Sequence, residues 1–180
     1  MFRMKSLDGV IERRLLTNFR VRPEVLAQCL PPPFQPQLVD GWGMAGVCLI
    51  RLGHVRPGGL PARRGLSSEN AAHRMAVTWP DHDGPRHGVY IPRRDTNSLI
   101  NRAVGGRFFP GAHRSARFTV EETDGHVSAA MQSFDGAASL SVSGHVAHRL
   151  ADNSLFRSLE EASDFFRDGS LGLSATSRCD

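Results

Sequence analysis

Residues 88–118 hold six arginines, one aspartate and one histidine, but no lysine. The arginines of this segment are Arg93, Arg94, Arg102, Arg107, Arg114 and Arg117. Guanidinium groups bind carboxylates and phosphates through paired hydrogen bonds, so this density predicts a site for an anion. Solvated arginines, or arginines paired with nearby carboxylates, would explain the same pattern.

Glu69 and His113 are the candidates for proton transfer. Glu69 lies between a short loop and a predicted strand at residues 70–79, where a carboxylate at the mouth of a barrel could act as a general acid or base. Its plainer interpretation is a solvated loop glutamate. His113 would be the second proton carrier. The predicted catalytic residues are Glu69 and His113, and the predicted anion ligands are Arg74, Arg94, Arg107 and Arg114.

Arg74 and its neighbour His73 lie within the predicted strand at residues 70–79, so their side chains point to opposite faces. His73 shares its face with large apolar residues, which is typical of a hydrogen-bonded core histidine. Arg74 shares its face with small and polar residues, which could line a cavity. Asp95 is most simply a helix cap or the ion-pair partner of an arginine.

Several other chemistries lack the residues that they need. The glycine-rich residues 105–111 have neither the lysine nor the hydroxyl of a phosphate-binding loop. His145 and His148 would point to opposite faces of a strand, and the three cysteines are widely spaced, so we predict no metal and no cofactor. The Gly-x-Ser-x-Gly motif of serine hydrolases is absent.

The length of 180 residues predicts a single domain that spans residues 1–180. The net charge is +4, and all of the 22 basic residues except Lys5 are arginines. Because the basic residues are spread along the chain and no nucleic-acid-binding motif is present, the sequence disfavours a nucleic-acid partner. No apolar run approaches the ~18 residues of a membrane span, and the N-terminus lacks the apolar core of a secretory signal. With few cysteines, this predicts a cytoplasmic protein without a membrane partner.

The elements that must position these residues are mostly strands. Apolar periodicity and turn residues predict strands at residues 13–21, 42–52, 70–79, 87–91, 114–121, 126–134 and 138–149. Short helices are predicted at residues 23–30, 97–104 and 158–166, and a loop at residues 55–66. The fold class is therefore α+β and rich in strands, with an antiparallel sheet that closes into a barrel or packs as a sandwich.

Longer stretches of the sequence resemble a known family. These are LSSENAAHRMAVTW (66–79), GVYIPRRDTNSLINRAVGGRFFPG (88–111) and HRSARF (113–118), supported by residues 15–52 and 165–177. They are similar to the bacterial DUF2071 family of the acetoacetate decarboxylase-like superfamily. The resemblance implies a strongly curved antiparallel sheet that forms a cone-shaped barrel with a pocket inside. It also implies a small anionic ligand, such as a carboxylate or keto acid.

The sequence departs from the true decarboxylases at their nucleophile. In those enzymes a lysine beside a second lysine follows an aromatic-proline pair and forms a Schiff base with the substrate. Here Phe109 and Pro110 are followed by His113 and Arg114 at the matching positions. Glu69 matches a pocket glutamate of the family, whereas a second family glutamate is replaced near Met44. The resemblance therefore implies a retained pocket without the Schiff-base reaction.

Related domains continue with further strands after the segment that matches residues 165–177. The chain is thus expected to be a short variant or a domain truncated at its C-terminal end. An incomplete barrel exposes a sheet edge, which would favour a homo-oligomer.

Three functions stay open at this point. The first is a barrel that binds a small anionic metabolite, with or without turnover. The second is a non-enzymatic ligand-binding or structural domain, in which arginines form salt bridges with Asp95 and Glu69. The third, and least favoured, is binding of nucleic acid.

Overall fold

The computed structural model describes residues 7–59, 61, 65–99, 111 and 113–175. The long strands are β1 (Leu7–Val21), β4 (Trp42–Pro57), β5 (Leu66–Asp81), β6 (Gly84–Thr96), β7 (His113–Thr123), β8 (His126–Ser133) and β9 (Ser139–His145). The short elements are α1 (Pro23–Ala27), β2 (Gln35–Pro36), β3 (Leu38–Val39), α3 (Leu159–Asp168) and β10 (Gly172–Leu173).

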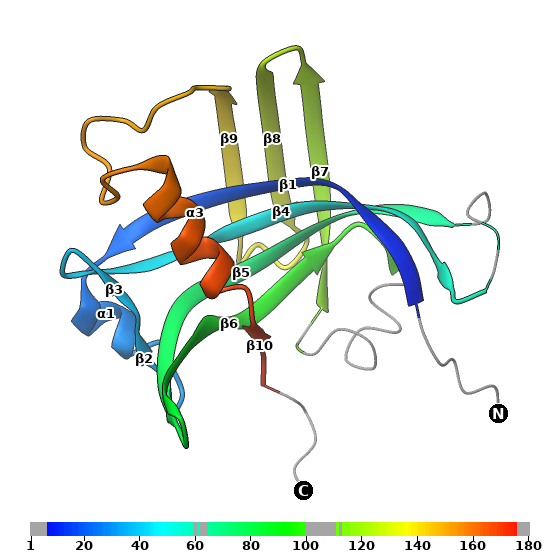
Figure 1. Ribbon diagram of the computed structural model, residues 1–180. Coiled ribbons are helices and arrows are strands. Elements are labelled where there is room, and N and C mark those ends of the chain that lie inside the picture. Colours follow the sequence, from blue (N-terminus) through cyan, green and yellow to red (C-terminus); the bar gives the residue numbers. More distant parts are fainter. Residues whose placement is uncertain (1–6, 60, 62–64, 100–110, 112, 176–180) are drawn as a thin grey trace, which may run out of the picture.

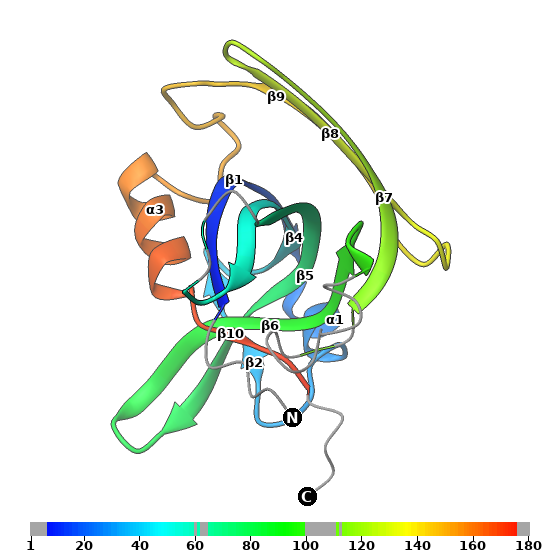
Figure 2. The same ribbon diagram turned by 90° about the vertical axis from the view of Figure 1, so that its right-hand side faces the viewer.

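One curved sheet carries all the strands, in the order β1-β4-β5-β6-β7-β8-β9. Its neighbouring long strands are antiparallel except β6 and β7, which run parallel, and β10 adds to β6 as a second parallel neighbour. The sheet curls so that β7, β8 and β9 fold back over β1, β4 and β5 (Figures 1 and 2). The described residues therefore form a half-barrel, which confirms the predicted curved antiparallel fold.

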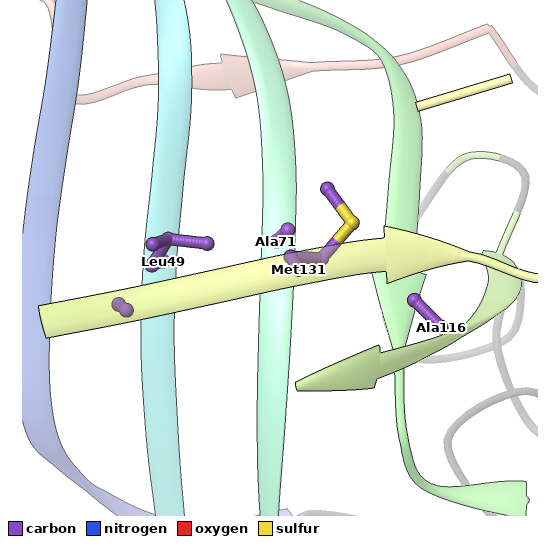
Figure 3. Packing of buried hydrophobic residues seen from close by; sticks show 5 residues of the cluster. Leu49, Ala71, Ala116 and Met131 are labelled. Atoms are coloured by element: carbon purple, nitrogen blue, oxygen red, sulfur yellow. The ribbon is translucent and has the colours of Figure 1, made fainter. Parts of the chain in front are cut away.

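The curl produces two layers with a core between them. This core is formed by five buried residues, namely Leu49, Ala71, Ala116, Ala129 and Met131. Figure 3 shows Met131 of β8 lying against the strands that carry Leu49 and Ala71. Alternate residues of β4 and β5 point into this layer, because successive side chains of a strand point to opposite faces. We call this side of the sheet the β8 face.

The opposite side of the same strands we call the α3 face. It carries a second cluster of Cys48, Ala72, Val89 and Ile91, with Leu16 and Ile50 packed against it. Phe166 of α3 lies over this face, with its ring centroid 5.3 Å from the guanidinium carbon of Arg74. The α3 face is thus covered by a helix rather than by strands (Figure 2).

The predicted strands are present in the structure, but several of them begin or end at other residues than predicted. Strand β4 runs to Pro57, into the predicted loop at residues 55–66, and β9 ends at His145 instead of Arg149. Strand β6 continues to Thr96, so Arg93, Arg94 and Asp95 lie inside a strand and not before a helix. Pairing explains this extension, because β5 and β7 both bind the backbone of this part of β6. The predicted helix at residues 97–104 lies mostly outside the described residues.

The predicted helix near the C-terminus is confirmed as α3. The Ser158 hydroxyl accepts a hydrogen bond from the backbone N–H of Glu161 at 3.1 Å, as its capping sequence predicts. The Glu161 carboxylate accepts in turn from the backbone N–H of Arg157. These bonds satisfy two backbone N–H groups at the start of α3 that have no partner within the helix.

Candidate functional site

Arg94 and His113 lie directly beside each other because β6 and β7 pair in parallel. Arg94 is the register partner of His113 on one side and of Ala72 of β5 on the other. Ala72 is in turn opposite Cys48 of β4. This row crosses the sheet on the α3 face, since side chains that are opposite in neighbouring strands share a face.

A cavity of about 150 Å³ lies along this row. Its polar lining is formed by Asn70, Arg94, Asp95 and His113, and its apolar wall by Ile11, Ile50, Leu52, Ala71 and Ala72. A mostly apolar cavity with a few polar groups on one side is the usual form of a small-molecule site. Arg94 supplies the positive charge in this cavity.

Burial lowers the pKa of both Arg94 and His113. Desolvation lowers the pKa of Arg94, although a guanidinium still remains protonated in a protein. The pKa of His113 is lowered by burial and by the charge of Arg94, while a contact with the Gly111 carbonyl opposes both. His113 Nδ1 is 3.1 Å from the Gly111 carbonyl oxygen. Because a carbonyl only accepts, Nδ1 carries the proton of the neutral ring, and Nε2 is left as a base.

Arg74 lies on the same α3 face, beneath α3. Its side chain is buried, with 6% relative exposure, and its NH2 group donates to Asn18 Oδ1 at 3.1 Å. Within the part of the chain that the structure describes, no carboxylate lies within ion-pair distance of Arg74. Burial lowers the pKa of Arg74, and the charge of Arg14 lowers it further.

Glu69 lies on the β8 face, opposite to Arg74. Its two carboxylate oxygens contact Arg13 NH2 at 2.5 Å and Arg51 Nε at 2.7 Å. Glu122 of β7 contacts the same two arginines. Register explains the cluster, because Arg13, Arg51 and Glu69 lie side by side on β1, β4 and β5. Both oxygens of Glu69 are therefore engaged by cations away from the cavity.

Asp95 also points to the β8 face, although Arg94 next to it points to the α3 face. Its fully buried carboxylate accepts from Arg93 at 2.7 and 2.8 Å and contacts His73 Nε2 at 2.7 Å. Arg93 also binds Asp135 in the turn between β8 and β9. This network joins β5 and β6 to that turn.

The structure brings only some of the predicted site residues together. Arg94 and His113 meet at the cavity, and Arg74 lies further along the same face. Glu69 lies on the other face, and Arg114 is an exposed residue of β7. Arg107 lies outside the described residues. Asn70 and Cys48 were not predicted as part of this face. Alternation along β5 from Arg74 and Ala72 contained the signal for Asn70, whereas the place of Cys48 depends on the register between β4 and β5.

Among the described residues, no three side chains of histidine, cysteine, aspartate or glutamate lie close enough together to hold a metal ion. Among the helices within the described ranges, none is long and apolar enough to cross a membrane.

Comparison with known proteins places the chain in a family. Residues 10–168 match the model of DUF2071, which is described as an uncharacterized conserved protein. The chain belongs to the DUF2071 family. No curated protein is significantly similar in sequence to this DUF2071 chain.

Solved structures share the fold of this DUF2071 chain. Acetoacetate decarboxylase from Legionella pneumophila superposes with a TM-score of 0.59 at 12% identity, covering 90% of this chain and 56% of that one. An acetoacetate decarboxylase-like enzyme from Sphingomonas wittichii RW1 gives 0.53 at 18% identity, with coverage of 77% and 56%. The enduracididine biosynthesis enzyme MppR complexed with pyruvate gives 0.55 at 11% identity, with coverage of 78% and 57%. The chain spans little more than half the length of these proteins.

Proposed function

We propose that this protein binds a small carboxylate or keto acid in the cavity on the α3 face, without forming a Schiff base. The observation that carries the proposal is the pairing of Arg94 with His113 in a cavity whose other walls are mostly apolar. A guanidinium would bind the carboxylate by charge-assisted hydrogen bonds, and the apolar wall would contact the carbon chain. His113 Nε2 would accept or return a proton.

The distribution of charge supports an anion at this position. Strand alternation turns Glu69 and Asp95 to the β8 face, where Arg13, Arg51 and Arg93 neutralise them. The α3 face carries Arg74 and Arg94, and Arg94 is the guanidinium that lines the cavity. Asp95 also lines the cavity, but its carboxylate is engaged by Arg93 and His73, so an acid entering the cavity would meet the guanidinium of Arg94.

The residues at the expected nucleophile positions argue against an imine. A Schiff base needs a neutral amine, and an arginine cannot supply one because its guanidinium stays protonated. His113 and Arg114 occupy the positions that the resemblance assigns to lysines, and Lys5 is the only lysine of the sequence. Any reaction here would use proton transfer through His113. The pyruvate bound to MppR supports a keto acid as the first probe.

A second candidate is a domain that binds a ligand without turnover, or none, and in which the charged residues brace the fold. The closed contacts of Glu69 with Arg13 and Arg51 favour this alternative for the β8 face. Under it, Arg94 would contribute to stability only.

Binding of pyruvate, 2-oxobutyrate and acetoacetate, measured by isothermal titration calorimetry, tests the proposal. Arg94→Gln should weaken binding by roughly ten- to a hundredfold, since a hydrogen bond to a charged group contributes about 1.5–3 kcal/mol. Arg117→Gln is the matched control, because Arg117 is an exposed arginine of the neighbouring strand β7. If none of the acids binds, or if Arg94→Gln binds as the wild type does, the anion site is wrong. Absence of imine trapping by borohydride is also expected.

A further inference from the structure

The two ends of the cavity on the α3 face differ in polarity. Arg94 and His113 come from β6 and β7, whereas the large apolar side chains come from β1 and β4, namely Ile11, Ile50 and Leu52. Strand β5 lies between these two groups in the sheet. A bound acid that reaches from the polar end to the apolar end therefore crosses β5.

Register brings the apolar side chains together. Leu52 of β4 is opposite Ile11 of β1, and Ile50 shares its face because it lies two residues before Leu52. Ile11 lines the cavity although it is 57% exposed. It thus presents apolar surface that the carbon chain of a ligand would remove from water.

The distance between the two ends indicates the size of the ligand. Neighbouring strands lie about 4.8 Å apart, so two spacings, or roughly 10 Å, separate the backbones of β6 at Arg94 and β4 at Ile50 across the sheet. Pyruvate held by Arg94 would extend only one methyl group toward Ile50. A cavity of about 150 Å³ can hold a benzene molecule, with its six carbon atoms. The acid 4-methyl-2-oxopentanoate carries about as many non-hydrogen atoms beyond its carboxylate.

Among the described residues, no cation lines the apolar end of the cavity. Arg14 of β1 is opposite Ile50, but it is not part of the lining, and its Nε donates to Cys48 Sγ at 3.4 Å. Arg51, the residue after Ile50, points to the β8 face and binds Glu69. A second carboxylate on the ligand would therefore lie against apolar side chains without a partner, which is costly.

We propose that the cavity selects monocarboxylic 2-oxo acids with an apolar chain of about four carbon atoms. In this assignment Ile11, Ile50 and Leu52 determine the specificity, because they contact the chain and leave a second carboxylate unpaired. The inference rests on the proposed function, since it takes the carboxylate of the acid to be held by Arg94.

Calorimetric titration of the wild type with acids of different chains tests the selection. Each buried CH₂ group strengthens binding about fourfold, so 4-methyl-2-oxopentanoate should bind roughly ten- to sixtyfold more tightly than pyruvate. The dicarboxylic acid 2-oxoglutarate should bind at least about tenfold more weakly than 4-methyl-2-oxopentanoate. Equal affinities for pyruvate and 4-methyl-2-oxopentanoate, or tighter binding of 2-oxoglutarate than of either, would overturn the assignment.

The variant Ile11→Ala tests the apolar end at an exposed position, where the fold should tolerate the change. It should weaken binding of 4-methyl-2-oxopentanoate by about threefold or more and leave pyruvate binding unchanged. Ile50→Ala should do the same to a larger extent. Val10→Ala is the matched control, because Val10 is the neighbouring exposed residue of β1 and does not line the cavity. An equal loss for both acids in Ile11→Ala and Ile50→Ala would contradict a contact with the chain.

This inference and the proposed function fail in different ways. If none of the acids binds, or if Arg94→Gln binds them as the wild type does, the anion site itself is wrong and the selection is wrong with it. If the acids bind through Arg94 but their affinities do not depend on the chain, only the assignment of Ile11, Ile50 and Leu52 is lost.

Discussion

The buried carboxylate of Asp95 provides a direct test of how burial determines the strength of the ion pairs in this fold. Arg93 binds two aspartates, each through two hydrogen bonds. Its bonds to Asp95 are 2.7 and 2.8 Å long, and those to Asp135 are 2.9 and 3.1 Å long. The side chain of Asp95 is 0% exposed, whereas that of Asp135 is 37% exposed. Asp95→Asn and Asp135→Asn are therefore comparable changes that differ in burial and in the additional contact of Asp95 with His73.

The expected loss for Asp95→Asn follows from its contacts. Removing one partner of a buried ion pair costs about 3–5 kcal/mol. We expect a value near the lower end, about 3 kcal/mol, because Arg93 keeps Asp135 as a partner. For a protein of this size that corresponds to a fall in melting temperature of roughly 6–12 °C. Asp135→Asn should cost clearly less, since solvent screens an exposed pair.

The effect of Asp95→Asn should also depend on pH. Burial by itself would raise the pKa of Asp95, but hydrogen bonds from His73 and Arg93 outweigh it and leave the pKa below its ordinary value of 3.8. A carboxyl with a lowered pKa in the folded state stabilises the fold above about pH 4 and loses this contribution as the pH falls through the lowered value. The difference between wild type and Asp95→Asn should therefore be largest near pH 7 and shrink in acid.

Urea unfolding followed by circular dichroism at pH 7 and at pH 3 measures both effects. Equal losses for Asp95→Asn and Asp135→Asn would show that burial does not determine the strength of these pairs. A difference between wild type and Asp95→Asn that grows in acid would refute the assigned direction of the pKa shift.

Three further predictions concern the core, the edge of the sheet and Glu69. Leu49→Ala should cost about 2–5 kcal/mol in urea unfolding, because Leu49 is 2% exposed between the two layers. Gly46→Ala should cost about 1–3 kcal/mol and speed hydrogen exchange in β1, because the new Cβ would lie 2.1 Å from the Thr17 carbonyl oxygen. Glu69→Gln should lower stability by about 3 kcal/mol but leave pyruvate affinity unchanged, as expected for an ion pair away from the cavity. Weaker pyruvate binding by Glu69→Gln would instead support a direct role of Glu69 at the ligand.

Local patterns in the sequence were sufficient to predict most of the strands. The expectation that the Schiff-base lysine is missing rests on the family resemblance and stays a prediction. The alternation around His73 and Arg74 predicted their opposite faces, and turn residues marked the hairpins. The separation of Glu69 from Arg74 was also within reach, since an odd number of positions separates them. The predicted strand starts at residue 70 and leaves Glu69 outside it, whereas β5 begins at Leu66.

The partners of these side chains depended on tertiary structure. The sequence by itself determined which residues share a face along each strand, because side-chain direction repeats every two residues within one strand. It also determined which residue types are available, since Lys5 is its only lysine. Only the tertiary structure placed Arg94 beside His113 and Glu69 between Arg13 and Arg51. These contacts depend on the register between strands that are distant in the sequence, and register is decided by how the two layers of the sheet pack.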